Sequence, residues 1–151
     1  MSSAPSYCFD TSGLLDGWSR YYSIRRFPTL WNHVAALFDT GRGFWPEEVW
    51  NEIHDDDLRQ WLAPLRRCEI ASAVVWSEAQ RIQQAHNREL NKSGITGADS
   101  FVIATAKIDE LVVVSGEVWS NGLPKIPNVC AREGIECLNF VALLDRENWT
   151  F

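Results

Sequence analysis

The chain has 151 residues, of which 46% are hydrophobic and 23% are charged, and its formal net charge is -6. This length suits one domain that buries roughly 70% of its unfolded surface, so we expect a single domain over residues 1–151. No stretch approaches the ~18 uninterrupted apolar residues of a membrane span, and the acidic charge argues against a protein that holds nucleic acid by a broadly basic surface.

Two further features narrow the class of protein. Residues 1–6 contain neither a basic region nor an apolar segment, so we expect no secretory signal and a cytoplasmic location. The four cysteines, Cys8, Cys68, Cys130 and Cys137, form no C-x-x-C pair and have no histidine at metal-ligand spacing. We therefore expect buried thiols rather than a structural zinc site.

In chain order, residues 7–12 have the pattern of a short strand that ends in Asp10 and two hydroxyl residues. Asp10 also fits an N-cap for a following helix, and the sequence leaves both interpretations open. A helix is predicted over residues 28–41, because a proline stands at its start and a glycine at its end. Residues 43–45 predict a second short strand, and the segment from Pro46 predicts another helix.

In that helix, Val49 and Ile53 mark the buried side, and Glu52 lies about 60° from Val49 at its edge. Glu52 is therefore placed to reach into a cleft, with Glu48 as the reserve candidate. The acidic run over residues 55–57 fits a solvated helix cap better than a metal site, because consecutive helical residues cannot face one point.

Residues 69–92 have a helical pattern of apolar and polar residues. Thr96 and Asp99 then form a capping-box pattern, which places Asp99 in the first turn of the next helix. Residues 111–114 are a continuous run of branched apolar residues, as in a parallel strand that is covered on both faces. The remaining predicted elements are a loop over 119–125, a helix over 127–134, a strand over 137–140 and a helical turn over 141–145.

Four acidic residues are predicted at one edge of the sheet. Asp10 and Glu117 each follow a strand, whereas Asp99 opens a helix and Glu52 lies at a helix edge. Ligands bind outside the carboxyl ends of strands in open α/β sheets, so we expect these carboxylates to share one crevice. Clustered carboxylates repel one another, and oxygen ligands suit Mg²⁺ or Mn²⁺. Such a site serves phosphoryl transfer, because one ion, or a pair ~4 Å apart, lowers the pKa of an attacking water and neutralises the leaving oxygen.

We assign catalytic and metal-binding roles to all four acids, with Asp10 and Asp99 as the main ligands. Ser12 and Ser115 are placed to orient these groups by hydrogen bonds. The segment after Trp18 is rich in arginine and tyrosine, which suits contact with phosphates and bases, although a solvated surface explains it equally well. The candidate substrate-binding residues in it are Arg20, Arg25 and Arg26.

Three segments carry motifs in an order that is typical of one family. Residues 9–12, 49–53 and 99–106 resemble the first, glutamate and third motifs of PIN-domain nucleases. The resemblance implies an α/β/α sandwich with a mainly parallel sheet and a metal-dependent endoribonuclease that hydrolyses RNA to 5'-phosphate and 3'-hydroxyl ends. In bacteria it also implies a VapC-like toxin with a cognate antitoxin protein. The arginine-tyrosine segment and residues 125–130 look like a less studied PIN-like branch.

The fourth motif departs from the family pattern. The usual motif has Thr or Ser, one further residue and Asp, whereas Ser115-Gly116-Glu117 supplies a longer acid. The extra methylene shifts the carboxylate by about a bond length, which affects rate or ion preference where the required geometry is tight.

Two other functions compete with a metal-dependent nuclease. A haloacid-dehalogenase-like phosphatase needs a second acid two residues after the first, where this chain has Ser12. A catalytically inactive PIN-like protein that binds a partner is the stronger alternative, because the Glu117 departure and the acidic charge both leave room for it. The eight tryptophans suit an apolar interface with an antitoxin or in a homodimer, and core packing explains them at least as well.

Overall fold

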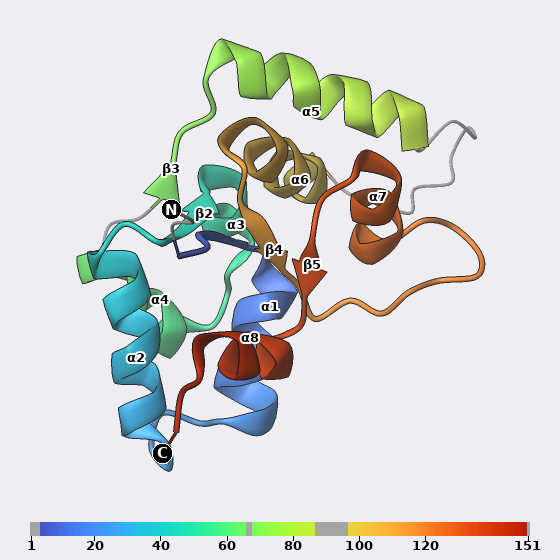
Figure 1. The fold of residues 1–151 in the computed structure, drawn as a ribbon. Coiled ribbons are helices and arrows are strands. Elements are labelled where there is room, and N and C mark those ends of the chain that lie inside the picture. Colours follow the sequence, from blue (N-terminus) through green and yellow to red (C-terminus); the bar gives the residue numbers. More distant parts are fainter. Residues whose placement is uncertain (1–3, 66–67, 87–96, 151) are drawn as a thin grey trace.

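The strands form a parallel sheet that helices cover on both faces (Figure 1). The computed structural model describes residues 4–65, 68–86 and 97–150. The strands lie in the order β3–β2–β1–β4–β5, and every neighbouring pair is parallel. Their bounds are β1 (Tyr7–Phe9), β2 (Gly43–Pro46), β3 (Cys68–Glu69), β4 (Val112–Val114) and β5 (Cys137–Leu138).

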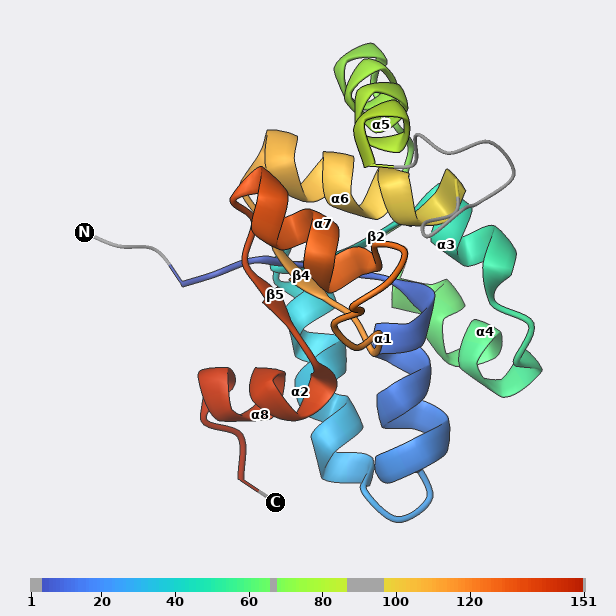
Figure 2. The ribbon, with the colours of Figure 1, turned by 90° about the vertical axis from the view of Figure 1, so that its right-hand side faces the viewer.

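The helices form a layer on each side of this sheet. In chain order they are α1 (Thr11–Leu15), the π-helical η1 (Asp16–Tyr21), α2 (Pro28–Asp39), α3 (Glu47–Glu52), α4 (Asp56–Leu62), the 3-10 turn η2 (Ala63–Leu65), α5 (Ala73–His86), α6 (Gly97–Asp109), α7 (Ile126–Glu133) and α8 (Phe140–Glu147). Helices α5, α6 and α7 lie on one side, and α1, α2 and α8 lie on the other (Figures 1 and 2). The predicted α/β/α sandwich with a parallel sheet is confirmed. Among the described residues, no helix is both long and apolar enough to cross a membrane.

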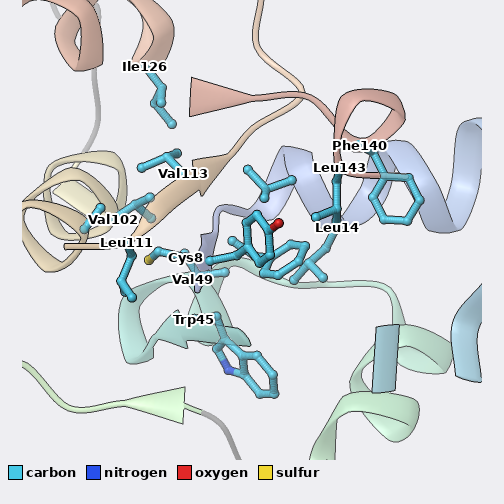
Figure 3. Close-up of a cluster of buried hydrophobic side chains, with 14 of the residues drawn as sticks. Cys8, Leu14, Trp45, Val49, Val102, Leu111, Val113, Ile126, Phe140 and Leu143 are labelled. Carbon is cyan, nitrogen blue, oxygen red and sulfur yellow. The ribbon is translucent and has the colours of Figure 1, made fainter. Parts of the chain in front are cut away.

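The core fills both faces of the central strands. Figure 3 shows Val102 of α6 and Ile126 of α7 on one side, and Leu14 of α1 and Phe140 of α8 on the other; all four side chains are buried. Burying one such side chain contributes roughly 1.5–3 kcal/mol. This packing fixes β1 beside β4, with Phe9 in register with Val114, so the residues that follow these two strands lie next to each other.

The helix predicted over residues 69–92 begins later than expected. Glu69 belongs to β3, which pairs with β2, and α5 begins only at Ala73. Ser72 acts as the N-cap that begins α5 at this point, because its Oγ accepts a hydrogen bond from the Val75 N–H at 3.2 Å. A two-residue strand has no hydrophobic period to detect. Residues 87–92 and Thr96 of the predicted capping box lie outside the described residues.

The last predicted strand is shorter than expected. Strand β5 ends at Leu138, and Phe140 already belongs to α8. The side chain of Asn139 accepts a hydrogen bond from the Ala142 N–H at 2.8 Å and so begins the helix. An Asn before an apolar run is a helix-start signal, and here it outweighs the apolar pattern of a strand.

Candidate active site

Asp10 lies between the last residue of β1 and the first residue of α1. Its Oδ1 accepts a hydrogen bond from the Gly13 N–H at 2.6 Å, which makes it the N-cap of the helix. The residue is only 2% exposed. The strand-end and N-cap interpretations of the sequence therefore both describe Asp10.

Two serine hydroxyls hold the other oxygen of this carboxylate. Ser12 Oγ donates to Asp10 Oδ2 at 2.8 Å, and Ser115 Oγ donates to the same atom at 3.0 Å. The hydroxyls are themselves fixed, because the Gly116 N–H donates to Ser12 Oγ at 2.9 Å and the Glu117 N–H donates to Ser115 Oγ at 3.1 Å. The side chain of Asp10 thus has a single orientation, set by β4 as well as by its own helix.

Burial makes the charge of Asp10 costly. Burial and, to a smaller extent, the charge of Asp99 raise the pKa of Asp10 to about 7, against the hydrogen bonds from Gly13, Ser12 and Ser115, which lower it. Asp99 is half-buried in the first turn of α6, a helix that packs on β1. The two carboxylates predicted as main ligands are therefore close enough to interact.

Glu52 lies at the rim of the same region. It is the exposed last residue of α3, and its Oε2 accepts a hydrogen bond from Thr11 Oγ1 at 3.2 Å. Thr11 directly follows Asp10, and α3 also packs against α6. Glu52 is thus hydrogen-bonded to Thr11, the residue next to Asp10, and is exposed to solvent.

Glu117 has a different partner. Its Oε2 accepts a hydrogen bond from the N–H of Ile126, the first residue of α7, at 2.9 Å. A carboxylate at a helix N-terminus is favoured by the helix dipole. The structure therefore places this longer acid between the end of β4 and the start of α7.

Three further residues shape the site without having been singled out in the sequence. A side chain at Gly13 would collide with the carbonyl of Val114, so glycine allows α1 to lie directly against β4. The carboxylate of Asp16 lies in the same way against Gly116. The buried amide of Asn128 accepts from the N–H groups of Ser120 and Lys125 and donates to the carbonyl of Ser120, which fixes the loop after Glu117.

A signal in the sequence existed for two of these residues. Gly13 and Asp16 closely follow the first motif, and a glycine in such a place often marks a close backbone approach. The role of Asn128 had no such signal, because its partners lie in a loop without a periodic pattern.

The three candidate arginines are all exposed and do not form one cluster with the acidic residues of the site. Arg20 is exposed and forms a 3.7 Å ion pair with Asp16. Arg25 lines an open cleft of about 520 Å³ together with Trp61. Arg26 is exposed.

The described residues contain no group of three or more Asp, Glu, His or Cys side chains placed to hold a metal ion. Mg²⁺, however, keeps several of its waters and is usually bound through one or two carboxylates. The oxygen donors of Asp10 and Asp99 suit Mg²⁺ or Mn²⁺ and not a soft metal. The residues present therefore fit a largely hydrated ion rather than one that is enclosed by protein ligands.

Comparison with known proteins gives one family and one fold. A family model described as "Domain of unknown function (DUF4411)" matches residues 7–151, and no curated protein matches the chain. The crystal structure of FitAcB from Neisseria gonorrhoeae is 15% identical with a TM-score of 0.53, over 89% of this chain and 98% of that one. The structure of FitAB bound to the IR36 DNA fragment is 16% identical with a TM-score of 0.54, over 88% and 94%. At these identities the similarity shows a shared fold.

Proposed function

This chain belongs to the family described as a domain of unknown function (DUF4411), and we propose that it is a divalent-metal-dependent endoribonuclease. The observation that carries the proposal is the buried carboxylate of Asp10, which three donors hold at the carboxyl edge of the sheet within the field of Asp99. Two such carboxylates are costly without a compensating cation. The fold shared with FitAcB and the motif resemblance to PIN-domain nucleases support this proposal.

In this proposal Asp10 and Asp99 would hold Mg²⁺ or Mn²⁺, and Glu52 and Glu117 would complete the site through water. A bound ion would supply a water of lowered pKa and neutralise charge on the leaving oxygen. Ser12 holds the carboxylate of Asp10 in the orientation that the reaction needs.

The proposed substrate is an RNA phosphodiester, and the proposed biological role is that of a toxin with a cognate antitoxin protein. The role rests on the resemblance to VapC-like toxins. Val118 and Trp119, which follow Glu117, are 80% and 59% exposed and offer apolar surface for an antitoxin or a second copy of the chain.

The proposal is tested by incubating a mixed-sequence single-stranded RNA with Mn²⁺ or Mg²⁺, with and without EDTA. The Asp99→Asn variant is compared with Asp109→Asn, which makes the same charge change at the exposed far end of α6. We expect the first variant to lose more than ~100-fold in rate, because removing even an indirect metal contact costs 10–100-fold, and the second to cut normally. Cutting by Asp99→Asn at the wild-type rate would overturn the assignment.

A partner-binding protein without catalysis is the second candidate. The observations that favour it are the engagement of Glu117 by α7 and the exposure of Val118, Trp119 and Leu123 on the loop that follows. A ligand that binds only the native state must raise its stability. Divalent ions that leave the melting temperature unchanged would therefore favour this candidate.

A further inference from the structure

We propose that the cleft beside α4 binds one nucleotide of the substrate strand, with its phosphate on Arg25 and its base against Trp61. This inference rests on the nuclease function proposed above and adds a contact away from the reacting phosphate. The cleft has a volume of about 520 Å³ and opens between α4 and the segment that follows η1. The lining residues that matter here are Trp18, Arg25, Asp57, Gln60 and Trp61.

The α1–η1 segment that follows Asp10 connects the candidate active site with this cleft. Near its start Thr11 donates a hydrogen bond to Glu52 of α3. Further along, the ring of Trp18 in η1 packs against that of Trp61 in α4, with centroids 5.7 Å apart. Trp18 is eight residues after Asp10, or roughly 12 Å at the helical rise. A strand with its reacting phosphate at Asp10 would reach the cleft roughly two to four nucleotides further on, at ~3.4 Å or more for each.

The aromatic wall of the cleft is preformed. Trp18, Trp31 and Trp61 pack mutually, with ring centroids 5.0, 5.3 and 5.7 Å apart. Trp18 and Trp31 are buried, whereas Trp61 is half-buried and lines the opening. The indole of Trp31 also donates a hydrogen bond to the carbonyl of Tyr22. The ring of Trp61 is therefore already held in place, so a base can stack on it without loss of side-chain entropy. Such stacking does not depend on the identity of the base.

The polar groups of the cleft match the rest of a nucleotide. Arg25 is exposed and offers a guanidinium that can contact a phosphate in two places. The amide of Gln60 both donates and accepts, and the carboxylate of Asp57 accepts from an exocyclic amino group, as acids do from cytosine. Because Asp57 repels phosphate, the phosphate is expected on the Arg25 side. One cation, an aromatic wall and an acid together suit a nucleotide better than an apolar peptide.

The test measures the salt dependence of RNA binding in a variant that cannot cut. Arg25→Gln and Arg26→Gln are each combined with Asp99→Asn, and binding to a labelled single-stranded RNA of about twelve nucleotides is followed by fluorescence anisotropy. Arg26 is the matched control, because it is the exposed neighbour of Arg25 and is not among the residues that line the cleft. We expect Arg25→Gln to weaken binding about tenfold and to reduce the salt slope by about 0.7, the share of one phosphate on a single strand. Arg26→Gln should change the slope little.

The outcomes separate this inference from the proposed function. If both variants lost RNA affinity equally, the effect would be one of general charge, and the cleft assignment would be overturned. It would also be overturned if neither variant lost affinity. Equally tight, Arg25-dependent binding of a polyglutamate peptide would also overturn it in favour of an acidic protein partner. RNA cleavage by the wild-type chain is measured separately. If the wild type cleaves RNA but Arg25→Gln does not change RNA binding, only the cleft assignment is overturned. If Arg25→Gln weakens RNA binding but the wild type does not cleave RNA, only the proposed nuclease activity is overturned. Equal melting temperatures exclude misfolding as the cause.

Discussion

The buried, ionised carboxylate of Asp10 destabilises the folded state. Its ordinary pKa is 3.8, and burial raises it to about 7 in the folded chain. Because the folded state binds this proton more tightly than the unfolded state, the contribution of Asp10 to stability is most favourable below about pH 4 and falls as the pH rises to about 7. A residue that lowers stability at neutral pH is typical of functional sites, where activity and stability conflict.

We therefore predict that Asp10→Asn stabilises the metal-free protein. In EDTA at pH 8 the free energy of unfolding should rise by roughly 2–4 kcal/mol, and the gain should vanish near pH 4. Urea unfolding at the two pH values measures it. The exposed Glu52→Gln is the control and should change little. A loss of stability in Asp10→Asn at pH 8 would contradict the electrostatic argument.

A cluster of charges links helix α5 to α6 and α7. Glu133 of α7 is only 9% exposed and accepts hydrogen bonds from Lys107 Nζ at 2.7 Å, from Arg81 at 2.5 Å and from the ring of His86 at 2.6 Å. Burial opposes the ionisation of Glu133, but these hydrogen bonds outweigh it and lower its pKa to about 2. One carboxylate thus joins α5, α6 and α7, the three helices on one side of the sheet (Figure 2).

Removing that carboxylate should loosen α5. We predict that Glu133→Gln lowers the free energy of unfolding at pH 7 by about 1–3 kcal/mol, a range reduced because Arg81 and Lys107 are partly exposed. The folded pKa lies below the unfolded one, so this contribution is present above about pH 4.5 and is lost as the pH falls toward 2. Thermal melting at pH 7 and pH 3 follows both effects.

The control for this variant is Glu136→Gln. Glu136 forms an ion pair with Arg146, but its side chain is 49% exposed whereas that of Glu133 is 9% exposed, and pairs of solvent-exposed charges contribute little. If Glu133→Gln and Glu136→Gln were equally stable at pH 7, the cluster would not hold α5.

The architecture of the molecule could be predicted because its helix ends carry local signals. Pro28 opens α2, and Gly134 ends α7 in the left-handed conformation, with a φ of 72°. The apolar run at β4 also identified a buried parallel strand. Such features depend on a few neighbouring residues, so they can be recognised in a single sequence. The π-helical η1 carries no such local signal, and its Gly17 lies against the ring of Phe140, which is distant in the sequence.

In the candidate site, the contact between Asp10 and Ser115 could be anticipated from the sequence, whereas the contact of Glu117 could not. The motifs indicated Asp10, Ser12 and Ser115, and the sheet places the last beside the first because β1 and β4 are neighbours. The partner of Glu117 was not predictable, because the loop that brings Ile126 to it has no periodic pattern. Contacts that a loop makes between distant residues therefore could not be predicted from this sequence.

The central claim is that the carboxyl edge of the sheet binds a divalent cation. Its most direct test is titration of the metal-free protein with Mn²⁺ by isothermal calorimetry and by melting temperature, for the wild type, Asp99→Asn and Asp109→Asn. We predict that the wild type and Asp109→Asn bind Mn²⁺ and gain thermal stability, and that Asp99→Asn does neither. No binding by the wild type, or equal binding by Asp99→Asn, would contradict the claim.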